Sequence, residues 1–166
     1  MGTFLMASAV GLTTGCAGPR DEEKPATGRS VERRVPYWVG GMDSQTIAKR
    51  LGVRIPQDAV EVKAAYQKGF QDDGLLLAFV LPSGKVDEFL KELDPEEPVV
   101  TQEVPFAGEA VPVTPFAHLG LPEPDSLAGV RKAQVCAPCE DNLNALHVAV
   151  AALDGKRSRV YLKAID

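Results

Sequence analysis

The chain has 166 residues, of which 45% are hydrophobic, and its 18 basic and 23 acidic side chains give a formal net charge of -5. A chain of this length can bury one hydrophobic core, so we expect a single folded domain. The acidic balance and the lack of a lysine or arginine cluster argue against binding to phosphate backbones. We therefore expect no nucleic-acid partner.

The first element is a short apolar run over residues 4–12, Phe-Leu-Met-Ala-Ser-Ala-Val-Gly-Leu. A helix that crosses a bilayer needs about 20 apolar residues, whereas the core of a secretory signal peptide needs only about 7 to 15. The run continues into Thr13-Thr14-Gly15-Cys16. An apolar run followed by small residues and Gly-Cys resembles the lipobox of bacterial prolipoproteins.

In that family the cysteine thiol receives a diacylglycerol, and the peptide is cleaved just before this cysteine. The resemblance implies that residues 1–15 are a signal peptide and that Cys16 carries the lipid. Thr13 stands where the family most often has leucine, and no basic residue precedes the apolar run. The alternatives are a secreted protein without a lipid and an intracellular protein whose apolar start is structural.

Residues 17–35 are rich in charge, proline and glycine and have almost no large apolar side chains. Such a segment cannot bury enough surface to order itself, so we expect residues 16–35 to form the lipidated cysteine and a flexible tether. As a coil this tether would span on the order of 25 Å. The expected location is the extracytoplasmic face of a bacterial cell membrane.

The three cysteines support this interpretation, because lipidation of Cys16 leaves Cys136 and Cys139 as a pair. An oxidising compartment favours a disulfide between them. The same C-x-x-C spacing is typical of thioredoxin-like redox motifs, but only 27 residues follow Cys139. A zinc site with His118 and His147 is a weaker alternative, and we expect neither a metal nor a cofactor.

The remaining chain, residues 36–166, is expected to form one α+β domain. Asp43 or Ser44 can cap a short helix that Gly52 ends. Alternating apolar residues over 60–70 predict a strand, and residues 71–74 end in an Asp-Gly turn that leads into a second strand over 75–81.

A helix over residues 83–93 is indicated by apolar side chains at Val86, Phe89, Leu90 and Leu93, which form one stripe. Residues 146–153 and 160–165 flank Asp154-Gly155 and predict a second hairpin, although residues 143–153 also fit a helical stripe. This αββ-αββ order predicts a two-layer α+β sandwich, with a four-stranded antiparallel sheet and two helices. It is the order of a circularly permuted ferredoxin-like fold.

Seven prolines make residues 95–124 a long insertion between the two halves, and its apolar residues argue that it packs against the domain. Phe106 and Phe116 in this insertion, with Tyr37 and Trp38 beside Gly40-Gly41, are candidates for a binding surface, although a single tryptophan is more often part of a core.

No phosphate-binding glycine loop, G-x-S-x-G or H-E-x-x-H motif is present in the sequence. We therefore expect a lipid-anchored, non-enzymatic binding or accessory module for an envelope protein, a peptide or a wall component. The alternative is an extracytoplasmic thiol–disulfide redox protein that uses Cys136 and Cys139.

Overall fold

The computed structural model describes residues 36–106, 112, 114–140 and 143–166, which belong to one compact unit that runs from Arg33 to Asp166. The predicted signal peptide, Cys16 and the predicted tether lie outside the described residues.

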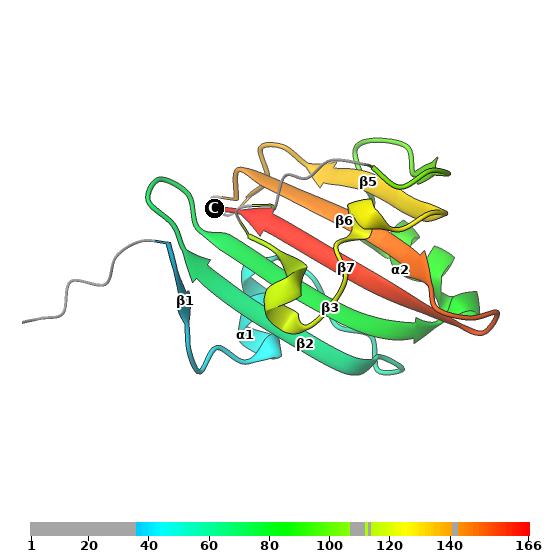
Figure 1. Ribbon diagram of the computed structural model, residues 1–166, viewed down its shortest axis with the longest axis horizontal. Helices are drawn as coiled ribbons and strands as arrows, with labels where there is room; N and C mark the ends of the chain where they lie inside the picture. The colour runs from blue at the N-terminus through cyan, green and yellow to red at the C-terminus, as the bar shows by residue number, and fades with distance from the viewer. Residues whose placement is uncertain (1–35, 107–111, 113, 141–142) are drawn as a thin grey trace, which may run out of the picture. The chain divides into compact units, whose positions relative to one another are not determined.

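The described chain forms an antiparallel sheet of seven strands in the order β1-β2-β3-β7-β6-β5-β4 (Figure 1). Two short α-helices and three single-turn 3-10 helices accompany it. The strands are β1 (Tyr37–Val39), β2 (Val60–Lys68), β3 (Gly74–Pro82), β4 (Val100–Gln102), β5 (Val130–Cys136), β6 (Ala145–Ala152) and β7 (Arg157–Ile165). The helices are α1 (Ser44–Arg50), η1 (Ser83–Lys85), α2 (Val86–Leu93), η2 (Phe116–Leu119) and η3 (Pro124–Ser126).

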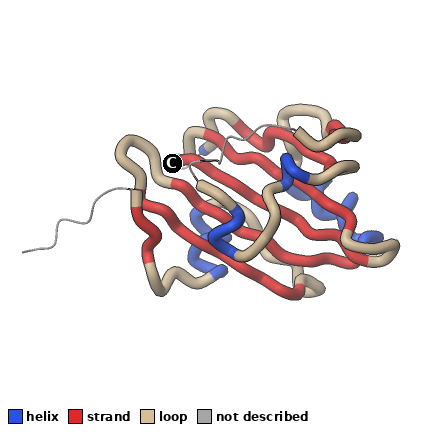
Figure 2. The backbone as a smooth tube through the Cα atoms, in the orientation of Figure 1, coloured by secondary structure: helices blue, strands red, loops and turns tan. Residues whose placement is uncertain are grey.

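The predicted four-stranded, ferredoxin-like α+β sandwich is therefore wrong, and the fold is mostly β (Figure 2). The four predicted strands are present as β2, β3, β7 and β6, and they form the middle of the sheet. Three further strands widen it at both sides. The strands β1 and β4 have three residues each, too few for a pattern, and β5 interrupts its apolar residues with Arg131, Lys132 and Gln134.

The helix α1 begins where its sequence predicts. The Asp43 side chain accepts hydrogen bonds from the Thr46 backbone N–H at 2.8 Å and from the Thr46 hydroxyl at 2.7 Å. Leu51 is the C-cap, and Gly52 follows it with a φ of +67°, a conformation that glycine adopts without strain. Ile47 and Ala48 face the sheet and are buried.

The sheet separates two apolar cores. On one face the sheet packs against α1 and α2 through residues such as Ile47, Leu77, Phe79, Phe89 and Leu162. On the other face Phe116 and Leu121, from the proline-rich segment, join Leu76, Ala78 and Tyr161. Figure 1 shows η2 in front of the sheet and both α-helices behind it. The prediction that the proline-rich insertion packs against the domain is therefore confirmed for Phe116 and Leu121, whereas Val104 and Phe106 are exposed.

The predicted hairpin β2–β3 closes around Asp73. Its carboxylate accepts hydrogen bonds from the Lys68 ammonium at 2.7 Å, the Gly69 backbone N–H at 3.0 Å and the Tyr66 hydroxyl. Burial of the carboxyl opposes its ionisation, but these hydrogen bonds outweigh burial and lower the pKa of Asp73 below its ordinary value.

We expect Asp73→Asn to lower the free energy of unfolding by about 1 to 2 kcal/mol at pH 7, because hydrogen bonds to a charged group are lost. Since the folded-state pKa is lowered, this stabilisation is present above the unfolded-state pKa of about 4 and disappears as the pH falls through the folded-state value. Urea unfolding of both proteins at pH 7 and below pH 4 measures it. Asp72→Asn is the matched control, because Asp72 is exposed and accepts only from Asn144 at 3.2 Å. An equal loss of unfolding free energy in the two variants would contradict a stabilising role of the hydrogen bonds to Asp73.

Candidate binding groove

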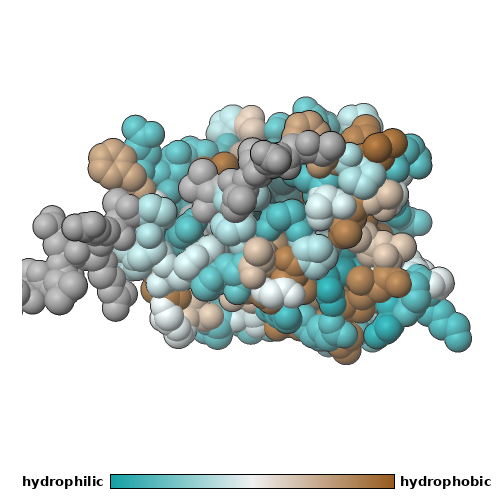
Figure 3. All heavy atoms as spheres, viewed as in Figure 1, coloured by the Kyte–Doolittle hydropathy of each residue, from teal (hydrophilic) through white to brown (hydrophobic). Residues whose placement is uncertain are grey.

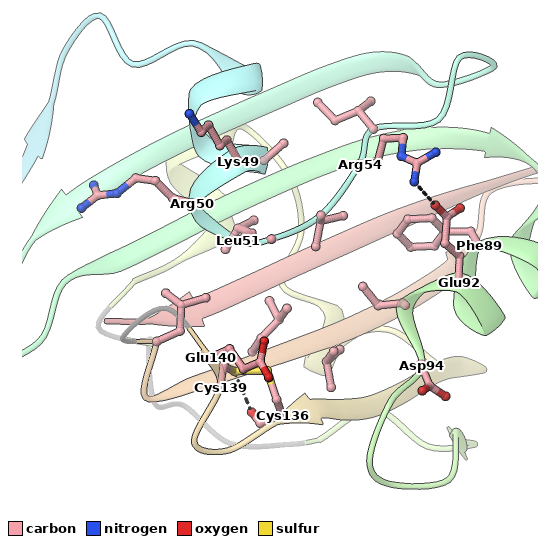
Figure 4. A pocket seen from close by; sticks show the side chains of 18 of the residues that line it. Lys49, Arg50, Leu51, Arg54, Phe89, Glu92, Asp94, Cys136, Cys139 and Glu140 are labelled. Atoms are coloured by element: carbon pink, nitrogen blue, oxygen red, sulfur yellow. Dashed lines mark hydrogen bonds and ion pairs between the residues drawn. A yellow bond between two sulfur atoms is a disulfide. The ribbon is translucent and has the colours of Figure 1, made fainter.

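A groove with a volume of about 1000 Å³ lies between α1 and α2, over the sheet face that they cover (Figure 4). The two helices have 7 and 8 residues, and at about 1.5 Å per residue they are roughly 10 to 12 Å long. Strands lie about 4.8 Å apart, so a sheet of seven strands is much wider than either helix can cover. The space left between the helices is the groove.

The floor and walls of the groove are mainly apolar. Val135 of β5 and Leu146 of β6 form part of the floor, together with Leu143. The α1 side contributes Ala48, Leu51, Val53 and Ile55, and the α2 side contributes Phe89 and Leu93. Three different parts of the fold therefore meet in one concave apolar surface.

The rim of the groove carries charges of opposite sign on its two sides. Lys49, Arg50 and Arg54 belong to α1 and the segment after it, whereas Glu92, Asp94 and Glu96 belong to α2 and the segment after it. Figure 4 shows the three basic side chains along one side, with Asp94 and Glu140 across from them. Only Arg54 and Glu92 meet across the rim, in an ion pair of 3.1 Å.

Arg50 has two partners that hold it at the end of the groove. Its guanidinium lies 4.6 Å from the centre of the Tyr66 ring and 3.5 Å from the carboxylate of Asp166. For the Lys49 ammonium, by contrast, the described residues provide no hydrogen bond or ion pair. The basic side of the groove therefore combines two paired cations, Arg50 and Arg54, with one, Lys49, whose ammonium is available to a ligand.

The disulfide between Cys136 and Cys139 lines the groove, with an S–S distance of 1.99 Å. The loop around it is also held by hydrogen bonds from the Cys139 N–H to the Leu143 carbonyl and from the Ala137 N–H to the Glu96 carboxylate. Cys136 is the last residue of β5, not the first residue of a helix whose dipole would lower a thiol pKa. The local geometry therefore suits a structural disulfide that shapes the groove floor.

Of the four aromatic residues predicted as a binding surface, Trp38 and Phe116 pack into the same core, and Phe106 lies apart from them. Tyr37 and Trp38 are in β1, and the Trp38 ring stacks on the His118 ring with 3.7 Å between the ring centres. Phe116 is only 3% exposed, and the centre of its ring lies 5.0 Å from the centre of the Tyr161 ring. It therefore belongs to the second core, the one on the sheet face opposite α1 and α2. Phe106 is 71% exposed and follows β4, at the opposite edge of the sheet from β1. The structure thus does not join these residues into one surface.

The residues of the zinc alternative are also kept apart. His118 stacks on Trp38, while His147 pairs with Lys163 across β6 and β7. Burial, and then the nearby Lys163 ammonium, lower the pKa of His147. Within the described part of the chain, no three histidine, cysteine or acidic side chains gather in a way that could hold a metal ion.

Sequence reasoning did not identify the groove, because its lining depends on β5 and on the separation of α1 from α2. In the sequence, Lys49, Arg54 and Glu92 look like ordinary solvent-exposed charged residues. The one signal present in the sequence was the Cys136–Cys139 pair, which marks the groove floor.

The chain matches no family model, and no curated protein or solved structure is similar enough to be identified as a relative. Over the described ranges, the helices are too short or too polar for any of them to cross a bilayer.

Proposed function

We propose that this protein is a lipid-anchored module at the outer face of a bacterial membrane, where it binds a protein, peptide or wall component in the groove between α1 and α2. The observation that carries the binding role is the groove itself. Ligand sites are concave and mostly apolar, have a few placed polar groups, and span about 300 to 1000 Å³. An apolar floor with fixed charges on its rim has these properties.

The proposed anchor rests on the sequence around Cys16. The apolar run over residues 4–12, the small residues before Gly15-Cys16 and the charged, proline-containing segment after them resemble a prolipoprotein signal followed by a tether. A tether of about 20 residues gives the groove access to ligands near the membrane surface without fixing its orientation.

The chemistry of the lining favours binding over catalysis. The aliphatic floor offers contact area, and the charged groups at the rim offer orientation. The two cysteines in the lining are joined to each other, so neither has a free thiol for attack. The redox alternative keeps one supporting observation, which is that the disulfide faces the groove. A purified protein that reduces insulin disulfides, and loses this activity in Cys139→Ser, would favour it.

Site-specific photocrosslinking tests the proposed groove. We expect a benzophenone amino acid at Lys49 to give a discrete crosslinked product in cells, because Lys49 lies on the rim. The same amino acid at Phe70, which is 85% exposed and is not part of the groove lining, is the control and should give none. Leu93→Trp, which adds volume at the groove wall, should abolish the Lys49 product. Equal products from both positions, or a Lys49 product that Leu93→Trp leaves unchanged, would contradict the proposal.

A further inference from the structure

The strand β4 is an edge of the sheet, and it is unusually apolar on the outside. It pairs with β5 on one side and is the last strand in the sheet order on the other. Val100 is 62% exposed, Val104 is 73% exposed and Phe106 is 71% exposed. Among the described residues only six large hydrophobic side chains are exposed, and three of the six lie within residues 100–106. Such a concentration is typical of an interaction site.

Hydrogen bonds to neighbouring parts of the chain hold residues 102–106 in place, although the side chains of Val104 and Phe106 are exposed. The Gln102 side-chain amide donates hydrogen bonds to the carbonyls of Asp125 at 3.0 Å and Leu127 at 3.2 Å, and it accepts one from the Lys132 ammonium at 2.7 Å. The Phe106 N–H donates to the Asp125 carbonyl at 2.8 Å. A partner that binds here therefore does not have to order the segment first, which lowers the entropic cost of association.

The charge around β4 indicates the kind of partner. Residues 87–103 contain seven acidic residues and one basic residue, Lys91, and three of the acids are paired with cations elsewhere in the fold. The two cations opposite β4 on β5, Arg131 and Lys132, are themselves paired with carboxylates. Glu97 and Glu103 flank β4, are exposed, and form no ion pair with any described residue. The edge therefore presents apolar side chains flanked by two carboxylates, without an ion pair in the described part of the chain, that attract cationic segments.

A second copy of this chain fits the edge poorly. Pairing two copies of β4 would bring the acidic flanks of both chains together, and like charges placed opposite each other are destabilising. A basic segment of another molecule avoids the charge repulsion.

We infer that β4 and residues 103–106 form a second docking surface, separate from the groove, for an extended basic peptide segment with apolar side chains. The backbone of β4 offers hydrogen bonds to such a segment, Val100, Val104 and Phe106 offer apolar contacts, and Glu97 and Glu103 offer ionic ones. Figure 3 shows apolar side chains at the upper right of the displayed face, over the region where Figure 1 draws β5 and the segment beside it.

Fluorescence anisotropy with two labelled peptides tests this surface. The probe alternates lysine and valine, and the comparison peptide alternates glutamate and valine. The full chain, purified in detergent, should bind the lysine peptide, and Phe106→Ala should weaken this binding about tenfold, as expected for an aromatic side chain at a contact centre. Phe70→Ala removes a phenylalanine that is 85% exposed in the β2–β3 turn and should leave binding unchanged.

A second pair of variants separates specific docking from general attraction to an acidic protein. Glu103→Lys should weaken binding more than Glu88→Lys, because Glu88 is already paired with Lys85 at 2.9 Å and lies away from β4 in α2. Four results would overturn the inference. They are no binding of the lysine peptide, equal binding of both peptides, equal effects of the Phe106 and Phe70 variants, and a dimer that chemical crosslinking detects and Phe106→Ala abolishes.

Discussion

Replacing Phe116 with alanine is expected to lower the free energy of unfolding by about 3 to 5 kcal/mol, the usual cost of removing a buried phenylalanine ring. Phe116 is 3% exposed and packs edge-on against Tyr161, whose own side chain is 1% exposed. Its removal leaves a cavity between the proline-rich segment and the sheet. Equilibrium unfolding in urea measures the change.

Phe106→Ala is the matched control, because Phe106 is the same residue type in the same proline-rich segment but is 71% exposed. We expect its free energy of unfolding to stay within about 0.5 kcal/mol of the wild type. Limited proteolysis adds a second measurement, since loss of the Phe116 contact should make the segment after it easier to cleave. If the two variants unfold at the same urea concentration, Phe116 is not part of the core around Tyr161.

Replacing Cys16 with alanine is expected to abolish incorporation of radiolabelled palmitate in a bacterial host. The thiol of Cys16 is the proposed attachment point of the lipid, and alanine offers no nucleophile in its place. Unmodified precursor should accumulate at the same time, because the resemblance implies that cleavage follows lipidation.

Cys139→Ala is the control for this experiment, because Cys139 is a half-buried residue of the disulfide and lies far along the chain from the lipobox. It should be labelled like the wild type. Equal labelling of the wild type and the Cys16 variant would show that the lipid, if present, is attached elsewhere.

Local patterns predicted the central part of the fold correctly. The cap at Asp43, the hairpin β2–β3 and the hairpin β6–β7 all depend on residues that are close together in the sequence. Residues 145–152 form the strand β6 and not the helix that their apolar stripe also fitted. The β-branched side chains of Val148 and Val150 and the turn after them favoured the strand.

The parts that could not be predicted depend on distant contacts. Alternation in β3 predicted one buried face, yet residues Leu75 to Leu81 are buried on both sides, because the proline-rich segment covers the second face. The strand β5 carries Arg131 and Lys132, one on each face and both half-exposed, so its sequence has no clear apolar run. Without β5, and without β4 that pairs with it, the sheet would keep five strands, and the groove would lose Val135 from its floor.

Phe106 and Phe116 illustrate the same limit for the candidate sites. Both are aromatic residues near prolines, and nothing in the neighbouring sequence distinguishes a docking residue from a core residue. Only the position of Phe116 above Tyr161, and of Phe106 beyond the edge strand β4, separates their roles.

The most direct test of the proposed anchored module is the mass of the protein purified from bacterial membranes. A lipid-anchored protein would give a mature chain that begins at Cys16 and is heavier than residues 16–166 alone by the mass of a diacylglyceryl group. Hydrolysis of the ester bonds would remove the mass of the two acyl chains and leave the glyceryl group on the Cys16 sulfur. A chain that still begins at Met1, or one that begins at or after Cys16 without a lipid, would contradict the proposed anchor.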